Sequence, residues 1–463
     1  MYYDLILCSL QFHGDDYGML ERCALVSRDF NRAASSLLYR RVVLSPPLRL
    51  HQLDLRKASP IDSLTNLLSA VLPRYAPLVL GLEISGFLSE RGPPRNTLNS
   101  VISDAVEKFT NLNSIKFIPN RYHPDFFVDS LKMLPGLASL QELCVNASCT
   151  DDEAKVQTLT QLRGLRKLAL HSPGRLILQT LPAWLERLQT TLDELHLLDN
   201  CGSITPGVLK SFLPHLSERL KAFSMGLSYS ISDDDISAFV DGLPELQQLQ
   251  LTYYYQIKAP VRKPRLPKLW SFTVMRSRYL LDDTDHARHI SAWIRRIISA
   301  SPLEVLNIVT EGNDDDGVIR RCCSAYDGLV DHLIAKHSSK LRRLEMKHCL
   351  VTTDTFRKLL TSCQLLENFY LAVDRVLLAH TFSQLLPSLV NLRSASFGIH
   401  NPKRRWRFEK DDVLEVMERS HALRLLSVNG TCWESLRGFS QDGVLSVAVA
   451  LYHPPVPPWQ RTT

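Results

Sequence analysis

The sequence lacks several features that would assign it at once to a broad class of protein. No apolar run approaches the ~18–20 residues that a helix needs to cross a bilayer. Residues 1–8 contain neither a basic segment nor a small-residue cleavage site, so we predict no signal peptide. Neither sign of charge dominates, because 54 Lys and Arg stand against 48 Asp and Glu in 463 residues. We therefore expect neither a membrane nor a nucleic acid as partner.

The sequence also lacks the spacings that build common catalytic and metal sites. It contains no nucleophile elbow and no glycine-rich phosphate loop. Its ten cysteines occur singly, apart from Cys322 and Cys323, and none has zinc-site spacing. His286 and His289 lie near an acidic run at 282–285, but their spacing is i to i+3 rather than i to i+4, and a solvated cluster is the simpler interpretation. We expect no catalytic residue, no metal ligand and no cofactor, and mostly buried, reduced thiols.

Three charged segments allow a functional interpretation. The basic cluster at 403–407 could bind phosphate or act as a nuclear localisation signal. The acidic runs at 282–285 and 311–317 could bind a cation or a basic ligand, although neither has the spacing of an EF-hand. A solvated loop is the simpler interpretation of each segment.

What the sequence does contain is a repeat. Residues 341–354 read L-x-x-L-x-L-x-x-C, followed by Val-Thr-x-Asp. From residue 140 to residue 246, successive copies begin 25 to 28 residues apart, inside the range of about 20–29 residues that leucine-rich repeats occupy. Clear copies of the six-residue core begin at Leu140, Leu165, Leu192, Leu246, Leu341 and Leu423, and looser copies begin at Val79, Leu112, Leu220, Leu269, Leu303, Leu366 and Leu392.

Each copy predicts a strand followed by a helix. Core positions one, four and six are apolar and should point inward, whereas positions three and five should point outward. After the copy at Leu192, Thr205 and Pro206 suit the start of a helix, and Leu209 and Phe212 begin an apolar helical spacing. We therefore predict an α/β fold, a leucine-rich-repeat solenoid over residues 79–431, with parallel strands on its concave face and helices on its convex face.

The first 46 residues predict a separate domain of short helices. Apolar residues recur at helical spacing from Leu20 and Cys23, and again from Phe30. Helices this short cannot bury all of their apolar faces against one another, so part of the surface near Leu25, Val26 and Phe30 should need a partner. The alternative is a helical cap on the repeats, because solenoids cover their terminal apolar faces.

Prolines mark the segments that flank the repeats. Residues 47–78 contain Pro60, Pro73 and Pro77 around an apolar helical pattern, which predicts a helical connector. The repeat pattern fades after Val428, so we predict a C-terminal tail over residues 432–463. Its proline-rich end cannot form a helix or an inner strand, and it should be an exposed polyproline II segment, free or bound to a proline-binding domain.

Residues 25–44 resemble the second half of an F-box, particularly of fungal members, in which V-S-R-x-F-x-x-L-A-x-x-x-L-Y-R-x-V-x-L is common. The family usually opens with a Leu-Pro pair and an acidic residue before its first helix, whereas this chain starts inside that helix. We therefore expect an N-terminally incomplete F-box. The matching residues are Val26, Ser27, Arg28, Phe30, Ala33, Leu37, Leu38, Tyr39, Arg40, Val42 and Leu44.

The repeats resemble the cysteine-containing subclass of leucine-rich repeats, which is often joined to an F-box. Cys349 stands at the cysteine position of that pattern and Cys201 is shifted from it by one residue. We assign these thiols to packing, since a small side chain fits where neighbouring turns crowd.

Together the two resemblances imply a non-catalytic substrate-recognition subunit of an SCF (Skp–cullin–F-box) ubiquitin ligase, in the cytoplasm and/or the nucleus. The F-box would bind a Skp-family adaptor and through it a cullin, and the repeats would bind an unknown target protein. The chain would act by proximity, because it would hold the target's lysines beside a charged ubiquitin-conjugating enzyme. One alternative is a non-catalytic repeat scaffold that no longer recruits a ligase, and another is an enzyme whose site the repeats conceal.

Two sets of residues follow from this interpretation. The residues expected to bind the adaptor are Leu5, Ile6, Leu20, Leu25, Val26, Phe30 and Leu37. The residues expected to bind the target from core positions three and five are Glu142, Lys167, Glu194, His196, Gln248, Gln250, Arg343, Glu345, Asn368 and Tyr370.

Overall fold

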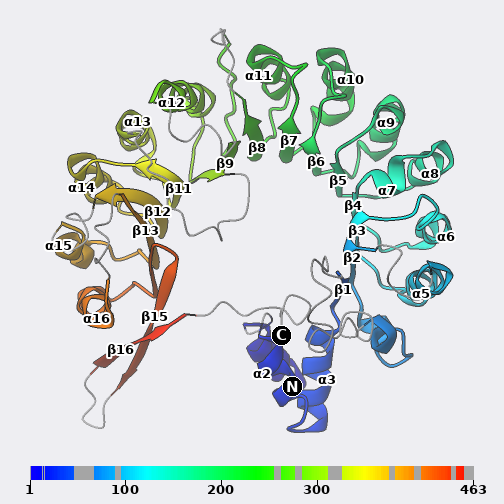
Figure 1. Ribbon diagram of the computed structural model, residues 1–463, viewed down its shortest axis with the longest axis horizontal. Helices are drawn as coiled ribbons and strands as arrows, with labels where there is room; N and C mark the ends of the chain where they lie inside the picture. The colour runs from blue at the N-terminus through cyan, green and yellow to red at the C-terminus, as the bar shows by residue number, and fades with distance from the viewer. Residues whose placement is uncertain are drawn as a thin grey trace, which may run out of the picture. The chain divides into compact units, whose positions relative to one another are not determined.

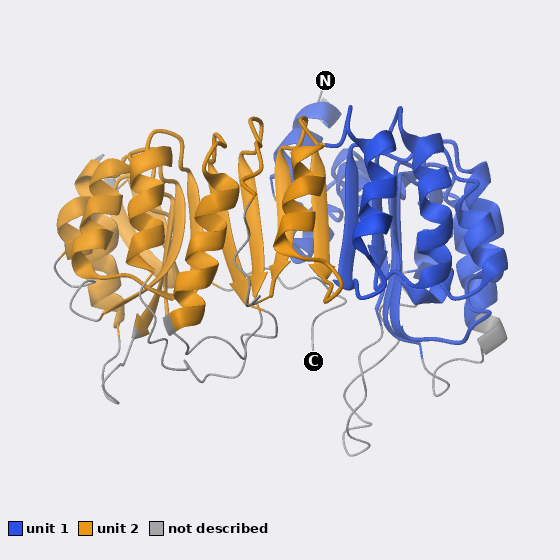
Figure 2. Cartoon of the chain, turned by 90° about the horizontal axis from the view of Figure 1, so that it is seen from above, with its two compact units in different colours: residues 1–220, 454–463 blue, residues 221–453 orange. Residues whose placement is uncertain are grey.

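The computed structural model describes residues 2–12, 14, 16–45, 67–88, 95–254, 262–276, 284–310, 326–374, 381–400, 408–439 and 445–452. They fall into two compact units (Figure 2). Unit 1 is residues 1–220 with 454–463, and unit 2 is residues 221–453. The division between the units falls inside the predicted repeat array.

Unit 1 opens with three short helices, α1 (Tyr2–Gln11), α2 (Tyr17–Cys23) and α3 (Arg28–Leu38). Two of them begin at capping side chains: Asp16 accepts from the Met19 amide at 3.0 Å, and Ser27 accepts from the Phe30 amide at 3.3 Å. We call this part the helical domain. Its small core is formed by Leu10, Leu20, Ala33 and Ala34.

The rest of unit 1 is a parallel sheet in chain order, with helices along one side of it (Figure 1). The strands are β1 (Arg41–Leu44), β2 (Gly81–Phe87), β3 (Ser114–Arg121), β4 (Glu142–Val145), β5 (Lys167–His171) and β6 (Glu194–Asn200). The helices are α5 (Arg95–Lys108), α6 (Val128–Met133), α7 (Ala147–Thr150), α8 (Glu153–Leu159), α9 (Arg175–Leu188) and α10 (Pro206–Leu216), with short 3-10 turns η2 (Ala76–Leu78) and η3 (Leu134–Gly136).

Unit 2 repeats this plan and ends differently. Its first eight strands are parallel, and the last two turn back antiparallel. The strands are β7 (Ala222–Leu227), β8 (Gln248–Tyr253), β9 (Ser271–Arg276), β10 (Val305–Thr310), β11 (Arg343–Leu350), β12 (Asn368–Asp374), β13 (Ser394–His400), β14 (Leu425–Val428), β15 (Thr431–Phe439) and β16 (Leu445–Leu451). The helices are α11 (Asp233–Asp241), α12 (Thr284–Ile298), α13 (Asp327–His337), α14 (Thr353–Ser362), α15 (Ser383–Leu385) and α16 (Lys410–Glu418), with the 3-10 turn η6 (Leu386–Ser388).

The strand register aligns equivalent repeat positions from turn to turn. Leu143, Leu168 and Leu195 lie side by side at core position four, and all three are buried between the sheet and the helices. Position one is buried as well, for example at Leu341, because the chain there turns into the strand. The predicted α/β fold of parallel strands and covering helices is thus confirmed, and Cys201 and Cys349 are buried within it.

The antiparallel strands β15 and β16 were not predicted from the sequence, since they lie in the segment assigned to a tail. They begin at a two-residue turn, in which Asn429 and Gly430 have φ values of 52° and 84°. Positive φ at both central residues is the signature of the tight hairpin turn that Asn-Gly favours. Val428 and Thr431 pair directly across this turn, so the last repeat strand reverses there instead of continuing the parallel order.

Two further expectations concern the connector and membranes. Residues 67–70 of the predicted connector are helical, whereas residues 47–66 lie outside the described part of the chain. No helix within the described ranges is long and apolar enough to cross a membrane.

Candidate functional site

The helical domain exposes apolar side chains at the turn between α2 and α3. Leu25 is 87% exposed and Val26 is 67% exposed, although the core residues of the helical domain are buried. The turn is held in place because the Asn31 side chain donates to the Ala24 carbonyl at 2.9 Å. Leu5, on α1, is exposed too. Leu5, Leu25 and Val26 are therefore the predicted adaptor residues that present an apolar surface to solvent.

The other predicted adaptor residues have a different position. Leu20 is 0% exposed, so its side chain belongs to the core of the helical domain and has no surface to offer a partner. Ile6, Phe30 and Leu37 pack against that core and are only partly buried. The sequence assigned all seven residues one role, but the structure separates Leu20 as a folding residue. An adaptor-binding role for the remaining six stays a prediction.

The helical domain is joined to the sheet by main-chain pairing as well as by the chain itself. The amides of Leu80 and Gly81 both donate to the Arg40 carbonyl, at 2.9 and 3.0 Å, where α3 gives way to β1. Beside this junction the rings of Tyr39 and Tyr75 stack with their centroids 4.0 Å apart, and burial raises the pKa of Tyr39. The last turn of α3 is thus fixed against the first strands of unit 1.

Opposite the helices, each unit has a sheet face that carries core positions three and five, and we call it the open face. Within unit 1 its charged residues neutralise one another across neighbouring strands. Glu83 pairs with Arg41 and lies 3.6 Å from the Lys116 ammonium. Lys167 lies 3.1 Å from Glu194. Most charges on this face are consequently paired within the chain; Glu142 instead accepts a hydrogen bond from the Ser114 hydroxyl at 3.2 Å.

Glu194 shows how strongly that pairing acts. A hydrogen bond from His196, whose Nε2 lies 3.2 Å from the carboxylate, and the nearby Lys167 lower the pKa of Glu194 to about 2, although its burial opposes them. Glu194 and His196, which are both predicted target residues, therefore contact each other. A partner that binds there must offer contacts that replace these interactions.

The open face of unit 2 has a different character. Its position-five side chains are mostly hydroxyls and amides, and the Asn307 amide donates to the Thr273 hydroxyl at 3.3 Å. At positions three and five of its described parallel strands the charged residues are Arg343 and Glu345, both on β11. Neither forms an ion pair with another described residue. The row at position five contains Ser224, Gln250, Thr273, Asn307, Glu345, Tyr370, Ser396 and Ser427.

Strand register brings several predicted target residues together around β11. Arg343 lies beside Asn368, and Glu345 lies beside Tyr370. The ring of Tyr370 is itself approached by the Lys347 ammonium, 5.7 Å from the ring centroid. Aromatic, cationic and anionic groups thus meet on two adjacent strands, and we call Arg343, Glu345, Lys347 and Tyr370 the β11 cluster.

The other predicted target residues are more dispersed. Glu142 and Glu194 lie on either side of Lys167 on the open face of unit 1. Gln248 and Gln250 lie on β8, three strands away from β11 in the sheet of unit 2. The sequence interpretation missed two open-face residues of unit 1, Glu83 and Lys116. They stand at position five of the looser copies that begin at Val79 and Leu112, so the same spacing would have found them.

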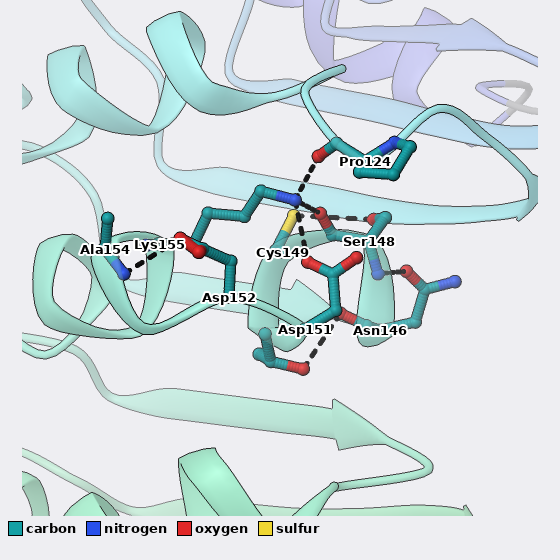
Figure 3. A network of polar contacts seen from close by, with 9 residues as sticks. Pro124, Asn146, Ser148, Cys149, Asp151, Asp152, Ala154 and Lys155 are labelled. Carbon is teal, nitrogen blue, oxygen red and sulfur yellow. Dashed lines mark hydrogen bonds and ion pairs between the residues drawn. The ribbon is translucent and has the colours of Figure 1, made fainter.

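A buried lysine lies in the helix layer of unit 1 (Figure 3). Lys155, on α8, is 4% exposed. Its ammonium donates to the Pro124 carbonyl, to the Ser148 carbonyl at 2.9 Å and to Asp151 Oδ1 at 2.7 Å. Because an ammonium has three protons, these three acceptors satisfy it completely. This lysine ties the segments before α6 and around α7 to α8, and it is a structural group rather than a nucleophile.

Part of the alternative metal site lies within the described residues. No group of three or more His, Cys, Asp or Glu residues that could hold a metal occurs within the described ranges. His286 is buried against Tyr253, with ring centroids 5.2 Å apart, whereas His289 is exposed. The rest of the acidic run at 282–283, the acidic run at 311–317, the basic cluster at 403–407 and the proline-rich end lie outside the described residues.

Comparisons with known proteins add little to this picture. No family model matches the sequence, and no curated protein matches it either. Among solved structures 61 chains match. One belongs to the crystal structure of the Rad7 and Elc1 complex in yeast; it is 15% identical, with a TM-score of 0.42, over 81% of this chain and 83% of that chain. At this identity and score we draw neither function nor partner from it, and the repeat architecture described above is the most specific description that is established.

Proposed function

We propose that this chain is the substrate-recognition subunit of an SCF ubiquitin ligase. The observation that supports this most is the exposure of the apolar Leu25 and Val26 side chains on a helical domain whose small core is buried. Apolar side chains gathered on an exposed surface commonly mark interaction sites. A Skp-family adaptor would cover them and link the chain to a cullin, in the cytoplasm and/or the nucleus.

The target protein would bind the open face of unit 2, centred on the β11 cluster. Arginine and tyrosine are enriched among the residues that dominate binding energies. Arg343 is exposed and has no ion-pair partner among the described residues, so binding there breaks no internal salt bridge. The open face of unit 1 is less suitable, since most of its charges pair with each other. The chain would provide no chemistry of its own and would act by raising the effective concentration of target lysines.

The adaptor arm is tested by co-purification of the full chain with a purified Skp-family adaptor. The double change Leu25→Asp and Val26→Asp should weaken binding by about 30-fold or more, as expected when residues that dominate an interface are lost. The control is Val390→Asp, which places an aspartate on an exposed valine of unit 2. Circular dichroism should show both variants folded, because all three side chains are exposed. Equal binding by the native chain and the double variant would refute the proposed surface.

The target arm is tested by proximity labelling in cells. Arg343→Glu combined with Tyr370→Ala should lose labelled partners while adaptor and cullin are retained. The charge-matched control is Arg424→Glu, an exposed arginine outside core positions three and five. If instead the native chain labels partners but never brings down adaptor or cullin, the chain is a repeat scaffold that recruits no ligase.

A further inference from the structure

The sheet of unit 2 ends in an apolar edge strand. Strand β16 pairs with β15 on one side, and no described strand pairs with its other side. Its seven residues carry no charged side chain, and the Ala448 side chain is exposed. Natural edge strands are usually protected by charges, prolines or bulges, because free N–H and C=O groups otherwise recruit another strand. An uncharged edge of this kind therefore indicates a pairing surface.

The register shows which backbone groups lie free. The Tyr452 amide donates to the Cys432 carbonyl at 2.8 Å, which makes these two residues a hydrogen-bonded pair. In an antiparallel ladder such pairs alternate along the strand. Residues 446, 448 and 450 thus bond to β15, and residues 445, 447, 449 and 451 turn their N–H and C=O groups to the free edge.

The sequence of β16 is nearly symmetric about Ala448. It reads Leu-Ser-Val-Ala-Val-Ala-Leu, so Leu445 corresponds to Leu451 and Val447 corresponds to Val449. If two copies pair antiparallel with Ala448 on the two-fold axis, each residue of one copy faces the residue of the other copy that lies equally far from Ala448 on the opposite side. Those facing pairs, 445 with 451 and 447 with 449, are also the residues whose backbone groups are free. The register that the side chains favour is the register that the hydrogen bonds require.

We propose that β16 pairs with β16 of a second copy of this chain and forms a two-fold homodimer with one continuous sheet across the contact. A strand that is its own mirror image suits a symmetric, self-complementary contact. No like charges oppose each other along it, and exposed Leu436, Phe439 and Leu451 surround the edge with apolar surface. Two strands of seven residues bury less than the ~1,600 Å² of a standard interface, so the dimer should be weak and concentration-dependent. This inference is independent of the proposed function.

The test uses a cross-link at the symmetry axis. Facing residues that are not a hydrogen-bonded pair have Cα atoms about 4.5 Å apart, which lies within the span of a disulfide. In the full chain Ala448→Cys should therefore form a covalent dimer under mild oxidation. Thr431→Cys, at an exposed position of β15 outside the proposed contact, is the control and should not. Equal cross-linking of the two variants, or none at position 448, would overturn the proposal.

Sedimentation velocity supplies an independent arm. The native chain should show a monomer–dimer equilibrium at about 10–100 µM, the range expected for a contact below standard size. Ala448→Lys and Ala448→Glu should each be monomeric, because like charges would face each other across the axis, and an equimolar mixture should restore the dimer. A native chain that stays monomeric throughout, as it would if the edge received only a different protein, refutes the proposal. So does a dimer that survives Ala448→Lys.

Discussion

The buried ammonium of Lys155 makes the sharpest prediction about stability. Lys155→Met keeps an apolar stem of similar length and removes the charge and its three hydrogen bonds. The buried carbonyl of Ser148 then loses this donor, which costs about 1–3 kcal/mol, whereas Pro124 is exposed and its carbonyl can regain water. Asp151, whose side chain is 32% exposed, regains water and contributes little. The free energy of unfolding of unit 1 should therefore fall by about 1–3 kcal/mol.

The assay is urea unfolding followed by circular dichroism. Lys132→Met is the matched control, because Lys132 also pairs with an aspartate, at 3.1 Å, but its side chain is 64% exposed. That variant should change the free energy of unfolding by less than about 0.5 kcal/mol. If Lys155→Met is as stable as the control, the buried hydrogen bonds of Lys155 contribute no more to the free energy of unfolding than the exposed pair of Lys132 does, and the argument fails.

Three other predictions test separate parts of the chain. Burial, with the nearby His332 and Lys336, lowers the pKa of His337 to about 4 in the folded chain. The unfolded chain has a histidine pKa of about 6.5. The folded state is therefore fully stable above pH 6.5 with respect to this group, and it loses stability as the pH falls from there toward 4. The free energy of unfolding should fall by about 2 kcal/mol between pH 7 and pH 5. A His337→Gln variant should lack this part of the pH dependence. If its urea midpoints change with pH as the native ones do, the assignment to His337 is wrong. Gly430→Ala should lower the free energy of unfolding by about 1 kcal/mol, since φ is +84° there. Gly136→Ala is the control and should cost less, because that position is equally uncrowded but has no positive φ. Equal urea midpoints for the two variants would argue against the turn at residues 429–430. Arg343→Glu should change the free energy of unfolding by less than about 0.5 kcal/mol. A misfolded variant would show that the open-face register is wrong.

The parts that could be predicted from sequence follow local rules. Burial at core positions four and six depends only on the alternation of side chains along a strand, so the positions of Leu344 and Met346 could be read directly. The helix that begins at Pro206 was predictable for the same reason, because its cap, Thr205, accepts from the Val208 amide at 3.4 Å only three residues away. Such signals lie within a few residues and need no knowledge of the remaining chain.

The parts that could not be predicted depend on distant main-chain groups. Lys155 resembles any polar helix residue in the sequence, and its acceptors are mostly carbonyls, one of them 31 residues away. Arg437 is similar: its guanidinium binds carbonyls after α16, including that of Leu423 at 3.1 Å. A carbonyl leaves no mark in the sequence, so these contacts are invisible there. The separation of Leu20 from Leu25 likewise needs the packing of three helices, since both are leucines at helical spacing.

The strand β1 also determines how the helical domain can be removed. It is the first strand of the sheet in unit 1, and its residues Arg41 to Leu44 pair with Gly81 to Ile84. A deletion of residues 1–45 would strip that strand away and leave β2 as an open edge, ready to aggregate. Any loss of function would then report a damaged sheet rather than a missing adaptor site. A truncation that begins at Arg40 keeps β1 and the carbonyl that receives the Leu80 and Gly81 amides, so it can separate the two effects.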